Sequence, residues 1–329
     1  MRMIRRIFLS VLCGLLCFGA VQAESVRERL QERRAIRAEA RDEAPIIRSG
    51  DYSFKLEHAG VTREYRVHVP RTYDPAVPTP LVLTFHGGGG NMNIQADDRF
   101  YRQISKSDQA GYIVVFPNGY SRLGGKLATW NAGNCCGAAR DAQSDDVGFV
   151  REMLVSLSKR LNVDASRVFA NGMSNGAMMA YRLACEMPEK FRAIAAVAGT
   201  DNTRSCEPLK PVSVLHIHAR DDEMVLFEGG AGRKSAATTE FVSVPDSIAK
   251  WSRLNACTGQ PRRLLETVGA YCEAYETCRA GSSVKLCVTE TGGHAWPGGS
   301  KPRGGDQTPT RSISATDLIW SFFSQQPVP

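Results

Sequence analysis

The sequence predicts an α/β fold in which a largely parallel central sheet is flanked by helices and preceded by a β-hairpin. Short apolar runs rich in β-branched residues alternate with stretches of helical periodicity along most of the chain. That alternation is typical of βαβ units. The 329 residues are 43% hydrophobic and 23% charged, which excludes a disordered or coiled-coil chain.

Residues 1–23 have the pattern of a secretory signal peptide. Three arginines precede an apolar run over residues 7–21, and Val21 and Ala23 put small residues at the two positions that a signal peptidase reads. This run is shorter than the about 20 apolar residues that a membrane anchor needs. A lipoprotein modified at Cys17 would need a small residue before it, but the preceding residue is Leu16. We therefore expect a secreted protein, extracellular or periplasmic, with no membrane span.

Residues 24–48 are expected to form a charged spacer before the catalytic domain, residues 49–329. Twelve of the twenty residues from 24 to 43 are charged, six of each sign, and few are large and apolar. The net charge of +7 falls to +4 without the three leader arginines. This surplus is too small for a nucleic-acid-binding surface.

An even number of cysteines beyond the leader predicts disulfides in an oxidising compartment. These eight are Cys135, Cys136, Cys185, Cys206, Cys257, Cys272, Cys278 and Cys287. Their spacing does not match the C-x2-C pattern of zinc sites. We expect the last four to pair among themselves around one candidate hairpin, and the adjacent Cys135 and Cys136 to pair with Cys185 and Cys206.

The elements follow in order. Alternating residues on both sides of Ala59 and Gly60 predict a β-hairpin over residues 51–69. Six strands are then expected in PLVLTFHG, YIVVFPNG, SRVFANG, FRAIAAVAG, PVSVLHIHA and SSVKLCVTE. Helices are expected after Asn91 and over residues 145–161, 175–185, 245–254 and 314–323. No internal repeat is present, which favours one catalytic domain.

The segment GMSNG, residues 172–176, has the Gly-x-Ser-x-Gly pattern of a nucleophile elbow. A predicted strand precedes it and a predicted helix follows it, as the sharp turn requires. Gly172 and Gly176 lack side chains and so permit a turn that lifts the Ser174 hydroxyl clear of its neighbours. Ser174 is therefore the candidate nucleophile.

A serine nucleophile needs a base, and the base needs an orienting carboxylate. His294 lies in a glycine-flanked loop after the last predicted strand, where a chain ordered Ser, acid, His would place its base. Asp221 and Asp222 both follow the strand PVSVLHIHA, and spacing alone barely separates them. His216 and His218 share a face of that strand, but no matching ligand cluster points to a metal site.

The glycine-rich segment HGGGGN, residues 86–91, follows a predicted strand and can supply backbone N–H donors to an oxyanion. We assign Gly87 and Gly88 to this role, with the N–H of Asn175 as their partner. The segment completes neither of the common phosphate-loop patterns, which argues against a nucleotide site.

With these residues placed, the chain resembles the secreted poly(3-hydroxybutyrate) depolymerase and feruloyl esterase group of α/β-hydrolases. The resemblance rests on LTFHGGGGN, GMSNGAMMAYRLAC, GGHAWPGG, and WNAGNCCG followed by DDVGFV, from roughly residue 50 to the last helix. It implies a serine ester hydrolase acting through Ser174, His294 and Asp222, since HARDD aligns Asp222 with the family's acid. It also implies that no cofactor or metal is required.

Trp130 and Trp296 are candidates for contacting an acyl or aromatic group of the substrate, although a packing role is as compatible with either position. We expect a monomer acting on polymer-linked esters such as feruloyl, acetyl or polyhydroxyalkanoate esters. A small-molecule carboxylesterase and an inactive binding protein of the same fold are the alternatives.

Overall fold

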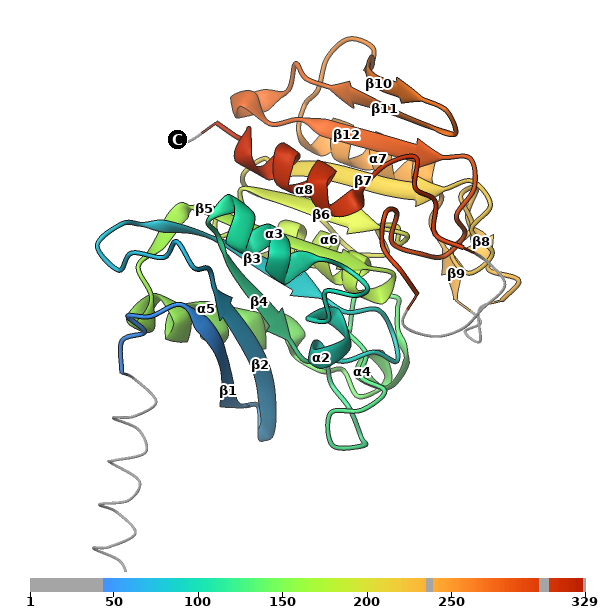
Figure 1. The fold of residues 1–329 in the computed structure, drawn as a ribbon. Coiled ribbons are helices and arrows are strands. Elements are labelled where there is room, and N and C mark those ends of the chain that lie inside the picture. The colour runs from blue at the N-terminus through green and yellow to red at the C-terminus, as the bar shows by residue number, and fades with distance from the viewer. Residues whose placement is uncertain (1–43, 235–238, 302–307, 328–329) are drawn as a thin grey trace, which may run out of the picture. The chain divides into compact units, whose positions relative to one another are not determined.

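Six parallel strands form the centre of the sheet in the computed structural model, which describes residues 44–234, 239–301 and 308–327. The sheet order is β1-β2-β4-β3-β5-β6-β7-β12-β11-β10 (Figure 1). The parallel strands are β3 (Thr79–Phe85), β4 (Ile113–Pro117), β5 (Val163–Met173), β6 (Ala193–Val197), β7 (Ser213–Ala219) and β12 (Val284–Thr289). The expected α/β fold and its largely parallel sheet are confirmed.

Antiparallel strands extend both edges of the sheet. On one side β1 (Gly50–His58) and β2 (Val61–Val69) form the predicted hairpin, with His58 opposite Val61. On the other side β11 (Ala270–Tyr275) pairs with β12, and β10 (Arg262–Thr267) forms the outer strand. A separate two-stranded sheet consists of β8 (Gly230–Ala231) and β9 (Glu240–Phe241).

Helices cover both faces of the sheet (Figure 1). One face carries α3 (Gln103–Ala110) and α8 (Ala315–Ser324), and the other carries α5 (Asp146–Arg160), α6 (Asn175–Glu186) and α7 (Val244–Leu254). Every residue of β3, β4, β6 and β7 is buried. Burial from both sides explains why these strands read as continuous apolar runs.

The helix expected after Asn91 is divided in two. The short α2 (Met92–Gln95) begins where the Asn91 side chain accepts hydrogen bonds from two backbone N–H groups, and α3 follows. The carboxylate of Asp98 accepts from the backbone N–H groups of Ile104 and Ser105, which caps the start of α3 and separates it from α2. The short helices α4 (Gly137–Asp141) and η1 (Arg279–Gly281) complete the order.

The cysteine pairing is partly as expected. Cys257 pairs with Cys278 and Cys272 pairs with Cys287 across β11 and β12, within the predicted group of four. The other expectation is wrong, because Cys185 pairs with Cys206 and the adjacent Cys135 and Cys136 pair with each other. The end of α6 brings Cys185 to a Cα distance of 5.3 Å from Cys206, a contact that sequence spacing does not encode.

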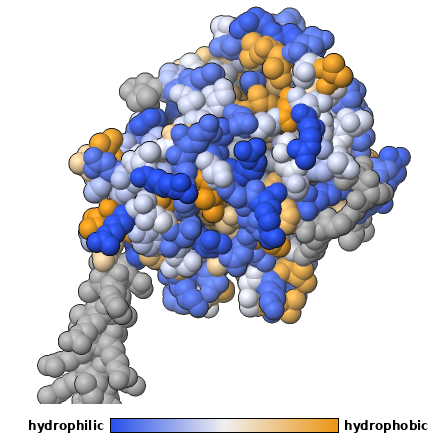
Figure 2. Space-filling model, in the orientation of Figure 1, coloured by the Kyte–Doolittle hydropathy of each residue, from blue (hydrophilic) through white to orange (hydrophobic). Residues whose placement is uncertain are grey.

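The proposed leader, residues 1–23, and most of the spacer, residues 24–48, lie outside the described part of the chain. Within the described residues, no helix combines the length and apolar character needed to cross a bilayer. The face shown in Figure 2 is mostly hydrophilic, with small and separate hydrophobic patches. Exposed apolar residues such as Leu209 and Val268, both 93% exposed, are ordinary for a globular protein when they occur singly.

Candidate active site

Ser174 occupies a sharp turn between β5 and α6. Its backbone adopts φ 56° and ψ −122°, a conformation that non-glycine residues rarely take, and its N–H donates to Val197 O at 2.8 Å. A Cβ added at Gly172 would collide with the backbone of Gly176, and one at Gly176 would collide with Phe85 O. The two glycines therefore let strand and helix approach closely enough to force this turn.

The other expected site residues follow neighbouring parallel strands. The glycine-rich loop follows β3, Asp222 follows β7 and His294 follows β12. Because the carboxyl ends of parallel strands lie at the same edge of a sheet, these three segments, distant in sequence, meet there with Ser174.

Asp222 and His294 are joined by a hydrogen bond of 2.9 Å between Oδ2 and Nδ1. The carboxylate is 2% exposed, and its Oδ1 also accepts from the backbone N–H groups of Met224 and Val225 at 2.8 and 3.0 Å. Burial alone would raise the pKa of Asp222, but the charges of His294 and His218 and their hydrogen bonds to the carboxylate outweigh it and hold that pKa well below its usual range. The carboxylate is thus ionised and held in one orientation.

Asp221 makes different contacts from its neighbour. Its carboxylate accepts from the backbone N–H groups of Gly293 at 2.8 Å and Gly292 at 3.4 Å. The side chain therefore holds the backbone of the histidine loop, whereas Asp222 holds the imidazole of His294 itself. Sequence spacing could not show which of the two aspartates binds the His294 ring, but their hydrogen-bond partners show that it is Asp222.

The glycine-rich loop lies against the nucleophile turn. A Cβ built on Gly87 would stand 3.5 Å from the Cβ of Ser174, and one on Gly88 would stand 3.6 Å from the Cβ of Asn175. This closeness is what an oxyanion-binding loop requires, because its N–H groups must reach an oxygen attached to the atom that the serine attacks.

His86 fixes the shape of this loop. Its Nδ1–H donates to Gly87 O at 2.8 Å, and its Nε2 accepts from the N–H of Gly119 at 3.0 Å. A carbonyl can only accept and an amide N–H can only donate, so the imidazole is neutral with its proton on Nδ1. Burial lowers the pKa of His86 to about 4, which agrees with the neutral form.

Trp130 lies beneath the loop. Its indole N–H donates to His86 O at 3.0 Å, and its ring packs edge-on against Phe85. The Asn175 side chain binds its backbone on both sides, accepting from Trp130 N at 2.7 Å and donating to Trp130 O at 2.9 Å. Trp130 is fully buried and is not among the residues that line the site pocket, so this placement favours packing over the expected substrate contact.

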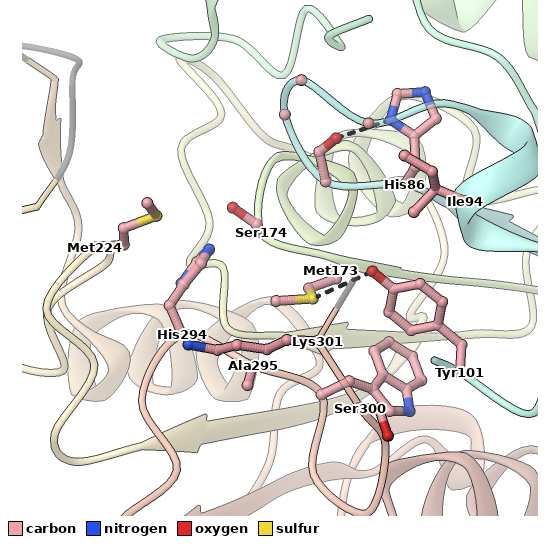
Figure 3. A pocket seen from close by; sticks show the side chains of 15 residues that line it. His86, Ile94, Tyr101, Met173, Ser174, Met224, His294, Ala295, Ser300 and Lys301 are labelled. Atoms are coloured by element: carbon pink, nitrogen blue, oxygen red, sulfur yellow. Dashed lines mark hydrogen bonds between the residues drawn. The ribbon is translucent and has the colours of Figure 1, made fainter. Parts of the chain in front are cut away.

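Ser174 and His294 line one pocket of about 290 Å³, and the His294 ring points toward Ser174 (Figure 3). The apolar part of its wall consists of Ile94, Tyr101, Met173, Met224, Ala295 and Trp296. Trp296 lines this pocket but is only 2% exposed, and its indole N–H donates to Thr316 Oγ1 at 2.9 Å, so both the expected substrate contact and a packing role stay compatible with its position. Lys301 also lines the pocket.

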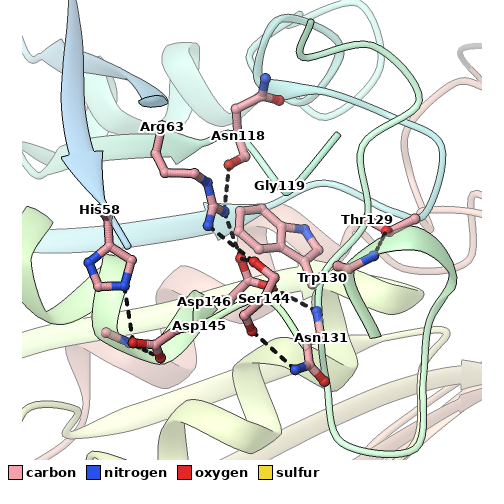
Figure 4. Close-up of polar contacts among 12 residues, drawn as sticks. His58, Arg63, Asn118, Gly119, Thr129, Trp130, Asn131, Ser144, Asp145 and Asp146 are labelled. Carbon is pink, nitrogen blue, oxygen red and sulfur yellow. Dashed lines mark hydrogen bonds and ion pairs between the residues drawn. The ribbon is translucent and has the colours of Figure 1, made fainter. Parts of the chain in front are cut away.

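A buried ion pair holds the segment that carries Trp130 (Figure 4). Arg63 on β2 binds Asp146 at the start of α5 at 2.6 Å, and the two side chains are 4% and 0% exposed. Asp146 also accepts from Asn131 N at 2.8 Å, and Arg63 donates to Asn118 O at 3.1 Å. The segment DDVGFV therefore holds the backbone next to Trp130 through Asp146 and does not line the pocket that contains Ser174 and His294.

Residues 57–259 match the model of the esterase family, described as "Putative esterase". The match covers more than half of the chain. The chain belongs to this esterase family. Esterase NocK of Nocardia uniformis subsp. tsuyamanensis, which carries the same description, is 30% identical over 74% of this chain and 73% of its own length.

Other relatives agree with this membership. Feruloyl esterase B of Piromyces equi is 28% identical over 71% of the chain, which spans 42% of that protein's length. Among solved structures, acetyl xylan esterase from Aspergillus awamori aligns with a TM-score of 0.56 over 83% of the chain and 99% of its own, at 14% identity. An S-formylglutathione hydrolase from Agrobacterium tumefaciens aligns with a TM-score of 0.52 over 86% and 97%, also at 14% identity. These structures establish the α/β-hydrolase fold.

Several residues of the site pocket carried no sequence signal. Ile94, Tyr101 and Met224 come from loops and a short helix whose apolar side chains resemble any other core residue in sequence. The supporting Arg63 lies in a hairpin where it reads as one polar residue among others. Arg63 on β2 and Asp146 at the start of α5 come together only in the folded structure.

Proposed function

We propose that the chain is a secreted serine hydrolase of carboxylic esters, with Ser174 as nucleophile, His294 as base and Asp222 as the acid that orients it. One observation carries the proposal: Ser174 in the strained turn lines the same pocket as His294, whose Nδ1 lies 2.9 Å from the Asp222 carboxylate. Nucleophile, base and orienting acid in this relation are the recurring arrangement of serine hydrolases.

In this mechanism Ser174 Oγ attacks the ester carbonyl carbon while His294 Nε2 accepts the hydroxyl proton. The carbonyl electrons move to the oxygen, which accepts hydrogen bonds from the N–H groups of the Gly87–Gly88 segment and Asn175. The intermediate collapses, the alcohol leaves with the proton from His294, and an acyl-enzyme remains. Water activated by His294 then releases the acid and restores Ser174.

Polymer-linked esters are the proposed substrates, with feruloyl or acetyl esters of polysaccharide first and polyhydroxyalkanoate second. The apolar and aromatic wall of the pocket, including Tyr101 and Trp296, suits an acyl group with a flat or hydrophobic body. Relatives named feruloyl esterase and acetylxylan esterase support the same order.

Secretion is supported by the leader-like residues 1–23 and by four cysteine pairs. Disulfides persist in oxidising compartments and are rare where thiols are kept reduced.

The experiment is a panel that measures release of ferulate, acetate and 3-hydroxybutyrate from their natural polymers, with Ser174→Ala as the control. We expect one acid to be released by the wild type and a loss of several orders of magnitude in Ser174→Ala, with the fold unchanged by circular dichroism. Stoichiometric labelling of Ser174 by an organophosphonate separates an active hydrolase from an inactive binding protein. Equal turnover in Ser174→Ala would refute the assignment.

A further inference from the structure

Three buried polar side chains form a row from α6 through β7 to the turn that carries Asp222. Tyr181 Oη lies 2.8 Å from His216 Nδ1, and His216 Nε2 lies 3.0 Å from His218 Nδ1. At the far end His218 Nε2 lies 2.8 Å from Val225 O and 3.4 Å from Asp222 Oδ2. We call Tyr181, His216 and His218 the buried polar row, and none of the three is more than 1% exposed.

When both rings are neutral, the contacts fix the direction of every hydrogen bond in the row. Val225 O can only accept, so His218 Nε2 carries a proton, and Nδ1 of the neutral ring accepts. His216 must therefore donate from Nε2 and accept at Nδ1 from the Tyr181 hydroxyl. Burial and the neighbouring His218 hold the pKa of His216 well below its usual value, which agrees with a neutral ring. Each donor in the row thus points toward the Asp222 turn.

The Tyr181 end of the row keeps its proton. Burial, and next the charge of Asp201, raise the pKa of Tyr181 well above its usual value. Asp201 itself pairs with Lys250 Nζ at 2.9 Å and accepts from the indole N–H of Trp251. The hydroxyl is therefore a fixed donor to His216.

A buried row of this kind carries a desolvation cost that an apolar trio would avoid, so its position needs a reason. It ends at the one turn that holds the Asp222 carboxylate. Asp222 Oδ1 is held by the N–H groups of Met224 and Val225, whereas Oδ2, the oxygen that faces His294, has the His218 N–H beside it. The same N–H binds Val225 O and so ties the turn to β7.

We propose that His218, held in one tautomer by His216 and Tyr181, is a positioning residue that orients the Asp222 carboxylate toward His294. The inference rests on the proposed function, and it assigns His218 no contact with substrate. Loss of its N–H would leave Oδ2 and Val225 O short of a donor, which would loosen the turn and the orientation of the imidazole.

The first test compares His218→Gln with His218→Leu in the full-length protein, using 4-nitrophenyl acetate as the probe. The glutamine Nε2 can occupy the place of the imidazole Nε2 and donate, whereas leucine cannot. We expect His218→Leu to lower kcat at least about tenfold with KM changed less than about twofold, and His218→Gln to recover most of kcat. Wild-type kcat in folded His218→Leu, or equal losses in both variants, would overturn the proposal.

A milder pair covers the case in which His218→Leu does not fold. Tyr181→Phe removes the hydroxyl at the far end of the row, and Tyr65→Phe removes another buried hydroxyl, which lies 3.3 Å from Ser156 Oγ. We expect kcat to fall in Tyr181→Phe by about two- to fivefold and to stay at the wild-type level in Tyr65→Phe. Equal kcat in the two variants contradicts the proposal.

A measurement on the wild type needs no variant. In ¹⁵N-histidine-labelled protein at neutral pH, long-range ¹H–¹⁵N spectra should show His216 and His218 as neutral rings protonated at Nε2. A ring protonated at Nδ1 in either residue would overturn the direction of the row.

The controls keep the two proposals apart. If 4-nitrophenyl acetate turnover does not depend on Ser174, the proposed function fails and this inference fails with it. If turnover depends on Ser174 but His218→Leu retains its kcat, only the positioning role is lost.

Discussion

Two adjacent aspartates hold the histidine loop in different ways. Asp222 is 2% exposed and binds the His294 ring, whereas Asp221 is exposed and binds the backbone of Gly292 and Gly293. An acid that orients a catalytic imidazole fixes its tautomer and stabilises the charge that forms on it. An acid that binds only the backbone of the loop can affect turnover only by positioning that loop.

We predict that Asp222→Asn lowers kcat on the order of 10⁴-fold, because the amide cannot stabilise the imidazolium of His294. Asp221→Asn should keep at least about a tenth of wild-type kcat, since its amide oxygen can still accept from Gly293 N. Steady-state kinetics check both variants, with melting temperatures as the control for folding. The opposite ranking of the two variants would move the acid to Asp221.

A buried ion pair joins the strand β2 to the helix α5. Arg63 and Asp146 meet with almost no exposure to solvent, and Arg63 also lies over the Phe149 ring at 4.2 Å. Two buried charges are tolerated because each satisfies the other. Removing one of them leaves the other buried without its partner.

We predict that Arg63→Met lowers the free energy of unfolding by about 3–5 kcal/mol because Asp146 loses its counter-charge. Adding Asp146→Asn should restore part of this loss, since the neutral amide can still accept from Asn131 N. Urea unfolding of the two single variants and the double variant measures the coupling. Losses that simply add would show that the pair does not act as a unit.

The buried His86 of the glycine-rich loop predicts a pH dependence of stability. The pKa of His86 is about 4 in the folded protein, below the 6.5 of an exposed imidazole, because the ring is buried. As pH falls from 6.5 toward 4, the unfolded chain binds a proton that the folded protein does not, so the free energy of unfolding falls. The contribution reaches about 3 kcal/mol at the lower limit.

His86→Gln removes this titration while the side-chain amide can still accept from Gly119 N. Over the same pH interval we expect the variant to lose less stability than the wild type, by up to about 3 kcal/mol, although it starts from a lower value. Denaturant unfolding at several pH values compares the two slopes. Parallel curves would contradict the assignment of a neutral, buried His86.

Across the part of the molecule that the structure describes, eight cysteines form four pairs. We predict that thiol titration of the denatured, unreduced mature protein, from which residues 1–23 have been removed, finds no free thiol, and that peptide mapping finds the links 135–136, 185–206, 257–278 and 272–287. Replacing both Cys272 and Cys287 by alanine should cost about 3 kcal/mol, because the bridge closes a loop of about 15 residues. A peptide linking Cys135 to Cys185 would refute this connectivity.

The sequence predicted the sheet and the loops that follow its strands because both depend on local patterns. Strands buried on two faces read as apolar runs, and the turn at Ser174 requires glycines on both sides of it. The pairing of Cys185, the burial of Trp130 and the ion pair of Arg63 depend instead on contacts between distant segments. No local pattern records such contacts, so they needed the structure.

The cysteine pairs also bear on the order in which the chain folds. Partners are separated by 1, 15, 21 and 21 residues, so each covalent link closes a short loop. The parallel sheet is different, because β3 pairs with β5 although β4 and several helices lie between them in the sequence. This pairing therefore closes a long loop. Each native link can therefore form from a local encounter whether or not the long-range topology is already assembled, and the native links impose no threading on the strands that come together last.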